Sequence, residues 1–211
     1  KSFRNKNKMV AIHNESNNLP VAFMNSYQDA SLYQFYTGSE SFSLNNIMGR
    51  KNQFDLWSTE DIYRGQKIML ILNYNNKKFD SIKNISETLR YKFINNFQSF
   101  STIQIIPIDL KETANASDTL NIKIQFETKN KVDIEKSNND YPSFISYHFF
   151  KGDQLIKQGV HFRIDNQKLN SVNNLKVVTP NDPGKYRLHL SIRTGWLPPT
   201  INSNSYEIEI K

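Results

Sequence analysis

The chain has 211 residues, of which 37% are hydrophobic and 22% charged, so it is long enough for one large or two small domains and is not a disordered polyelectrolyte. Its formal net charge is +7, but Lys and Arg are spread along the chain without a nucleic-acid-binding run, and we expect no nucleic-acid partner. The absence of Cys excludes disulfides, thiolate metal sites and Cys nucleophiles.

Helical and strand patterns alternate before about residue 90. The segments 19–24 and 67–73 are continuously apolar, which suits strands buried on both faces of a parallel sheet. Between them, Leu32, Phe35 and Tyr36 have the i, i+3, i+4 spacing of a helix.

Residues that commonly cap helices mark both ends of this predicted helix over residues 29–38. Ser26 or Asp29 can cap its N-terminus, and Gly38 supplies a stop at its C-terminus. For the remaining segments we expect a weak helix over 8–14, a strand over 41–45, a loop or short helix over 52–61 and a loop over 73–84.

The second part of the chain has the pattern of an antiparallel sandwich. Short strands with alternating apolar residues are separated by turn residues, such as Gly152 and Asp153. Asp182 to Tyr186 resembles the entry to the penultimate strand of immunoglobulin-like sandwiches, where a Tyr hydroxyl often closes a corner. The predicted strands are 103–109, 120–127, 144–151, 154–157, 160–164, 175–179, 186–193 and 206–210.

These patterns predict an α+β chain in two parts. Residues 1–90 would form a small α/β, Rossmann-like unit, and residues 91–211 an antiparallel immunoglobulin-like β-sandwich. The loss of helical periodicity places the boundary between about Asn84 and Gln98.

Known catalytic and cofactor signatures are missing from the sequence. It contains no G-x-S-x-G, phosphate-loop, G-x-G-x-x-G or H-E-x-x-H motif. The four His residues do not have the paired spacing of zinc ligands. We therefore expect no cofactor, no metal and no catalytic residue within this chain.

Amide, aromatic and charged side chains recur between residues 25 and 57, a stretch that includes Asn25 and Asn46. Aromatic faces cover the C–H surface of sugars, amides form hydrogen bonds with hydroxyl groups, and Arg forms bidentate hydrogen bonds with phosphate. Tyr27 and Gln28 also follow a predicted strand at the edge where α/β sheets bind ligands. The predicted substrate-binding residues are Tyr27, Gln28, Asn45, Arg50, Asn52, Gln53, Asp55 and Trp57.

The same stretch carries a family resemblance. Residues 19–28, Ser31 to Gly38, Ser43 to Asn46 and Arg50 to Trp57 resemble the C-terminal soluble region of Bacteroidetes-type integral-membrane glycosyltransferases. Those enzymes are similar to dolichyl-phosphate-mannose protein mannosyltransferases and lipid A aminoarabinose transferases. The resemblance implies a polyprenyl-phosphate sugar donor and a catalytic carboxylate in a membrane domain outside this sequence.

The leading hypothesis is an accessory domain at the extracytoplasmic (periplasmic) face of the bacterial inner membrane. It would help position donor or acceptor without being catalytic alone, and its partners would be the membrane domain of its own full-length chain and a polyprenyl-phosphate sugar or glycan acceptor. The alternative is a cell-surface or periplasmic carbohydrate- or protein-binding module. A third option is a soluble enzyme that uses Asp55, Glu60 or Asp61 as acid or base.

Overall fold

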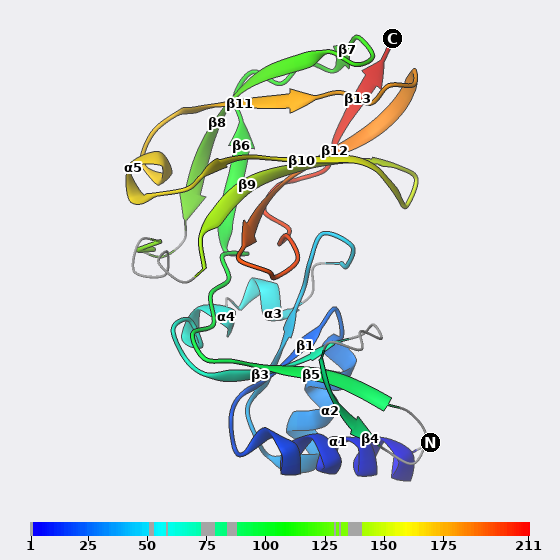
Figure 1. Cartoon of the computed structure of the whole chain (residues 1–211), viewed down its shortest axis with the longest axis vertical. Coiled ribbons are helices and arrows are strands. Elements are labelled where there is room, and N and C mark those ends of the chain that lie inside the picture. The colour runs from blue at the N-terminus through cyan, green and yellow to red at the C-terminus, as the bar shows by residue number, and fades with distance from the viewer. Residues whose placement is uncertain are drawn as a thin grey trace. The chain divides into compact units, whose positions relative to one another are not determined.

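A computed structural model describes residues 2–50, 53–57, 59–72, 79–83, 88–128, 130, 132–134 and 141–211 (Figure 1). Packing divides the chain into two compact units, residues 1–99 and residues 100–211. The fold is mostly β-sheet, in several separate sheets. Among the described residues, no helix combines the length and apolar character needed to cross a membrane.

The first unit contains a five-stranded mixed sheet in the order β2-β1-β3-β5-β4. Strands β1 (Val21–Met24), β2 (Ser41–Leu44) and β3 (Ile68–Leu72) are parallel to one another, and all their residues are buried. The apolar segments 19–24 and 67–73 therefore form parallel strands, as predicted. Strands β5 (Thr88–Ile94) and β4 (Asp80–Lys83) extend the sheet in antiparallel fashion.

Helix α2 (Tyr27–Thr37) connects β1 to β2 and lies against both strands. The Ser26 side chain accepts a hydrogen bond from the backbone N–H of Asp29, and Gly38 ends the helix with a φ of 69°. Both predicted capping signals are confirmed, because Ser26 satisfies a free helix N–H and Gly38 adopts a left-handed conformation without steric cost.

Helix α1 (Ser2–Ser16) packs against α2 and is longer than the predicted segment 8–14. Lys8 Nζ forms an ion pair of 3.2 Å with Asp29, and the imidazole Nδ1 of His13 lies 3.3 Å from the hydroxyl of Tyr33. These contacts with α2 hold a helix whose own apolar pattern is weak. Two apolar residues of α1 itself, Met9 and Ile12, are fully buried.

Two strands of this sheet were not predicted. β4 lies in the segment 73–84, which its Asn and Lys content had indicated as a loop; residues 73–78 lie outside the described residues. The boundary drawn at residue 90 falls inside β5, which pairs with β3 and β4 and so belongs to the first unit. The predicted loop or short helix over 52–61 contains α3 (Gln53–Leu56) and α4 (Thr59–Ile62).

The second unit is a two-sheet β-sandwich. One sheet has the order β10-β9-β12-β13-β7 and the other β11-β8-β6, and side chains from both form one hydrophobic core. Pairing is antiparallel except between β13 and β7. The strands are β6 (Ile103–Pro107), β7 (Thr113–Ala114), β8 (Thr119–Thr128), β9 (Ser143–Lys151), β10 (Gln154–Arg163), β11 (Asn173–Val178), β12 (Gly184–Thr194) and β13 (Tyr206–Ile210).

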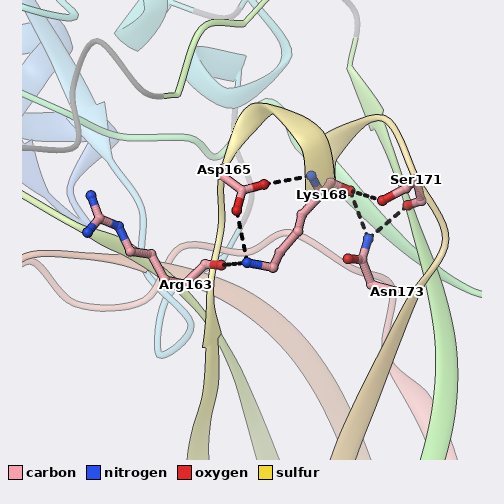
Figure 2. Close-up of polar contacts among 5 residues, drawn as sticks. All are labelled: Arg163, Asp165, Lys168, Ser171 and Asn173. Carbon is pink, nitrogen blue, oxygen red and sulfur yellow. Dashed lines mark hydrogen bonds and ion pairs between the residues drawn. The ribbon is translucent and has the colours of Figure 1, made fainter.

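A capped turn of helix, α5 (Asn166–Leu169), joins β10 to β11. Figure 2 shows Asp165 accepting hydrogen bonds from the backbone N–H and the Nζ of Lys168, while Nζ also donates to the carbonyl of Arg163. The hydrogen bonds from Lys168 lower the pKa of Asp165. After α5, the side-chain amide of Asn173 donates hydrogen bonds to the backbone carbonyls of Lys168 and Ser171.

Candidate functional site

The carboxyl ends of β1 and β2 are joined by an asparagine clamp. The Nδ2 of Asn25 donates to Oδ1 of Asn46 over 3.0 Å, and the backbone N–H of Asn46 donates to Oδ1 of Asn25 over 2.9 Å. Asn25 has a φ of 53°, a left-handed conformation that Asn tolerates better than most residues. The clamp fixes the turns after two neighbouring parallel strands, at the edge where α/β sheets bind ligands.

A second contact attaches α3 to the same edge. The Nδ2 of Asn45 donates to Oδ2 of Asp55 over 2.6 Å, and Oδ1 of Asn45 accepts a hydrogen bond of 3.0 Å from Ser43. Both ends of the Asn45 amide are therefore bonded within the protein. We call Asn25, Asn45, Asn46 and Asp55 the asparagine cluster.

Gly49 lies tightly against this cluster. A Cβ atom at this position would lie 2.4 Å from Oδ1 of Asn25 and 2.8 Å from its Cγ, much closer than real Cβ contacts. The backbone N–H of Gly49 donates to the carbonyl of Asn46, and the N–H of Met48 donates to the Asn46 side chain. Only glycine allows this loop to close over Asn25.

Large aromatic and apolar side chains that are close to the cluster in the sequence are exposed. Tyr27, two residues after Asn25, is 53% exposed, and Trp57, two residues after Asp55, is 66% exposed. Met48 is 61% exposed. Trp57 is supported by an edge-on contact with Phe54, whose ring is buried. Exposed aromatic rings on an ordered scaffold can cover the apolar faces of sugars.

The predicted site residues fall into three groups. Tyr27, Gln28, Arg50, Gln53 and Trp57 are exposed, whereas Asn45 is buried and Asp55 is half-buried within the asparagine cluster. Asn52 lies outside the described residues.

The side-chain amide of Asn45, which was predicted to bind substrate, is bonded within the protein to Ser43 and Asp55. The predicted set also omitted Asn25, Asn46, Met48 and Gly49. The positive φ of Asn25 is invisible in the sequence, and its partnership with Asn46 depends on β1 and β2 being neighbours.

The other carboxylates considered as acids or bases have protein partners. Oε2 of the buried Glu60 accepts a hydrogen bond of 3.1 Å from the Ser99 hydroxyl. Asp61 forms an ion pair with Arg64, whose Nε donates to the carbonyl of Ser99. These contacts fasten α4 to the end of the first unit, which favours a structural role for both carboxylates.

No described cluster of His, Asp and Glu has the three members needed to hold a metal ion. The four His residues are distributed over both units. His148 on β9 and His189 on β12 are directly opposite each other. Burial lowers the pKa of His148 to about 4, and repulsion from His189 and Arg193 contributes to a smaller extent.

No protein-family model and no curated protein matches this chain. A superoxide reductase (neelaredoxin) from Ignicoccus hospitalis is similar over 51% of this chain and 80% of its own, with 7% identity and a TM-score of 0.28. The Lin-41 filamin domain is similar over 52% of this chain and 92% of its own, with 15% identity and a TM-score of 0.29. Structural similarities this weak do not indicate a function for this chain.

Proposed function

We propose that this chain is an extracytoplasmic accessory domain of a membrane glycosyltransferase that uses a polyprenyl-phosphate sugar donor. The domain positions donor or acceptor at the edge of β1 and β2 and is not catalytic alone. The observation that carries the proposal is that two exposed aromatic residues, Tyr27 and Trp57, each follow a member of the asparagine cluster by two residues in the sequence.

The chemistry of this edge suits a phosphorylated sugar. Trp57 and Tyr27 offer aromatic faces, and the exposed amides of Gln28 and Gln53 can bond sugar hydroxyls. The exposed Arg50 and the positive end of α2 favour a phosphate group. The parallel arrangement of β1, β2 and β3 supports the Rossmann-like interpretation of this unit.

The competing proposal is a carbohydrate- or protein-binding module of the cell surface or periplasm. It is supported by the same exposed aromatic residues, and it needs no membrane domain. The two proposals differ in the ligand: an accessory domain for transfer should require the phosphate of the donor or an acceptor of the parent enzyme. A binding module should bind the free glycan equally well.

The non-catalytic part of the proposal is tested by incubating the purified chain with a polyprenyl-phosphate sugar and candidate acceptors. We expect no sugar transfer above the rate without protein, because the carboxylates considered have structural partners. In the full-length enzyme, Arg50→Lys should reduce transfer, since the charge is kept but the guanidinium fork is lost. Turnover by the isolated chain, or unchanged transfer by the Arg50→Ala enzyme, would contradict the proposal.

A further inference from the structure

Strand β13 has an incompletely covered edge in the second unit. β12 pairs with all of Tyr206–Ile210 on one side, whereas β7 pairs on the other side only at Glu209 and Ile210 (Figure 1). The N–H of Glu209 donates to the carbonyl of Glu112, and the N–H of Lys211 donates to that of Ala114. Because backbone groups alternate along a strand, the N–H and C=O of Glu207 are directed to this same edge, before β7 begins.

A groove with a volume of about 570 Å³ runs along this part of β13. Its size lies within the range of natural ligand sites. One wall comes from the segment between β6 and β7, where Ile108 is exposed and Leu110 is half-buried. The opposite wall is β13 itself. The lining residues are Pro107, Ile108, Leu110, Glu112, Thr113, Lys185, Ser205, Tyr206, Glu207, Ile208 and Glu209.

The charge of the groove is opposite to that of the chain. Three exposed carboxylates, Glu112, Glu207 and Glu209, line it with a single cation, Lys185, while the whole chain carries a formal net charge of +7. An acidic groove on a basic protein favours a cationic ligand and disfavours nucleic acid or free phosphate.

We propose that this groove binds an extended peptide in which Lys or Arg alternates with aliphatic residues. The peptide adds to β13 at Tyr206–Ile208, where its backbone bonds Glu207, as in other complexes formed by strand addition. Its cationic side chains face Glu112 and Glu207, and its aliphatic side chains contact Ile108 and Leu110. This inference concerns the second unit and does not rest on the glycosyltransferase proposal.

The first test is a titration of the ¹⁵N-labelled whole chain with a blocked Lys-Val-Lys-Val-Lys peptide and with its Glu-Val-Glu-Val-Glu counterpart. We expect the backbone amide signal of Glu207 to shift with the Lys peptide, and the Glu peptide to bind at least tenfold more weakly. The double variant Glu112→Gln, Glu207→Gln should bind the Lys peptide about tenfold more weakly than the unmodified chain. The matched variant Glu127→Gln, at an exposed position on β8 outside the groove, should bind it normally.

A second variant separates strand addition from charge attraction alone. Glu207→Pro removes an N–H that is directed away from β12, so the β12–β13 pairing is kept. It should bind the Lys peptide at least fivefold more weakly than Glu207→Gln. Equal binding by these two variants, equal binding of the two peptides, absence of binding, or shifts away from the groove would each overturn the proposal. Dimerisation of the chain through this edge would also overturn it.

Discussion

The hydroxyl of Tyr186 donates a hydrogen bond of 2.9 Å to the backbone carbonyl oxygen of Asp182. Tyr186 lies near the start of β12 and its ring is buried against Phe149 in the sandwich core. The bond therefore closes the turn that leads into β12 and confirms the corner predicted from the sequence of residues 182–186.

Replacing Tyr186 with Phe should destabilise the second unit by about 1 kcal/mol. The ring keeps its packing, but the hydroxyl that fixes the Asp182 turn is lost. Urea unfolding followed by circular dichroism measures the change. Tyr27→Phe is the matched control, because the exposed Tyr27 should lose less than about 0.5 kcal/mol. Equal losses in the two variants would show that the corner contributes nothing specific.

Gly49→Ala should disrupt the asparagine cluster. The new Cβ would occupy space that Oδ1 of Asn25 fills, so the Asn25–Asn46 clamp must open, at a cost of about 1–3 kcal/mol. Ligand binding at this edge should fall with it. The control is Gly152→Ala, where a Cβ meets open space but the φ of 56° causes strain. That variant should lose stability and keep ligand binding, and a similar binding loss in both variants would contradict the role of the clamp.

Stability should fall as the pH is lowered from about 6.5 toward 4, in part because of His148. Its side chain is 1% exposed and its Nδ1 is buried without a hydrogen-bond partner among the described residues. Burial lowers the pKa of the folded ring to about 4, so at pH values between 4 and 6.5 only the unfolded chain binds the proton. Above pH 6.5 the ring is neutral in both states and adds no pH dependence.

The contribution of His148 reaches about 3 kcal/mol at pH 4, at about 1.4 kcal/mol for each unit of pKa. Burial lowers the pKa of His189 as well, so it contributes in the same direction. Urea unfolding of the unmodified chain and of His148→Gln, at pH 7.5 and pH 5, measures the effect. The variant should lose less stability on acidification than the unmodified chain. An equal loss in both proteins would contradict the assignment to His148.

The strands of the sandwich could be predicted because their alternation is regular. Residues 206–210 form β13 as expected, since Ile208 and Ile210 face the core while Glu207 and Glu209, which alternate with them, are exposed. The predicted segments 154–157 and 160–164 form one strand, β10, with register shifts along it. The immediate neighbours of a residue do not reveal such an irregularity.

The first unit was predicted less well than the sandwich, because a domain boundary was expected where β5 runs. Leu89 and Tyr91 of β5 are buried and alternate with the half-buried Arg90 and Lys92, which is itself the pattern of a strand. The residue types of the candidate site could be chosen from their chemistry. Which of them are exposed, and which hold the loops together as Asn45 does, depends on neighbouring parallel strands far apart in the sequence.

NMR of the two Trp indole groups tests most directly whether Trp57 and Tyr27 bind a phosphorylated sugar, as proposed. The ligands are a short-chain polyprenyl phosphate hexose and the matching free hexose; the exposed Phe35 on α2 provides a control variant, Phe35→Ala. We expect the phosphorylated ligand to shift the indole signal of Trp57 but not that of Trp196. The free hexose should bind at least tenfold more weakly. Tyr27→Ala should weaken binding, while Phe35→Ala should not. No shift of the Trp57 signal with either ligand, or the same shift at Trp196, would contradict the account.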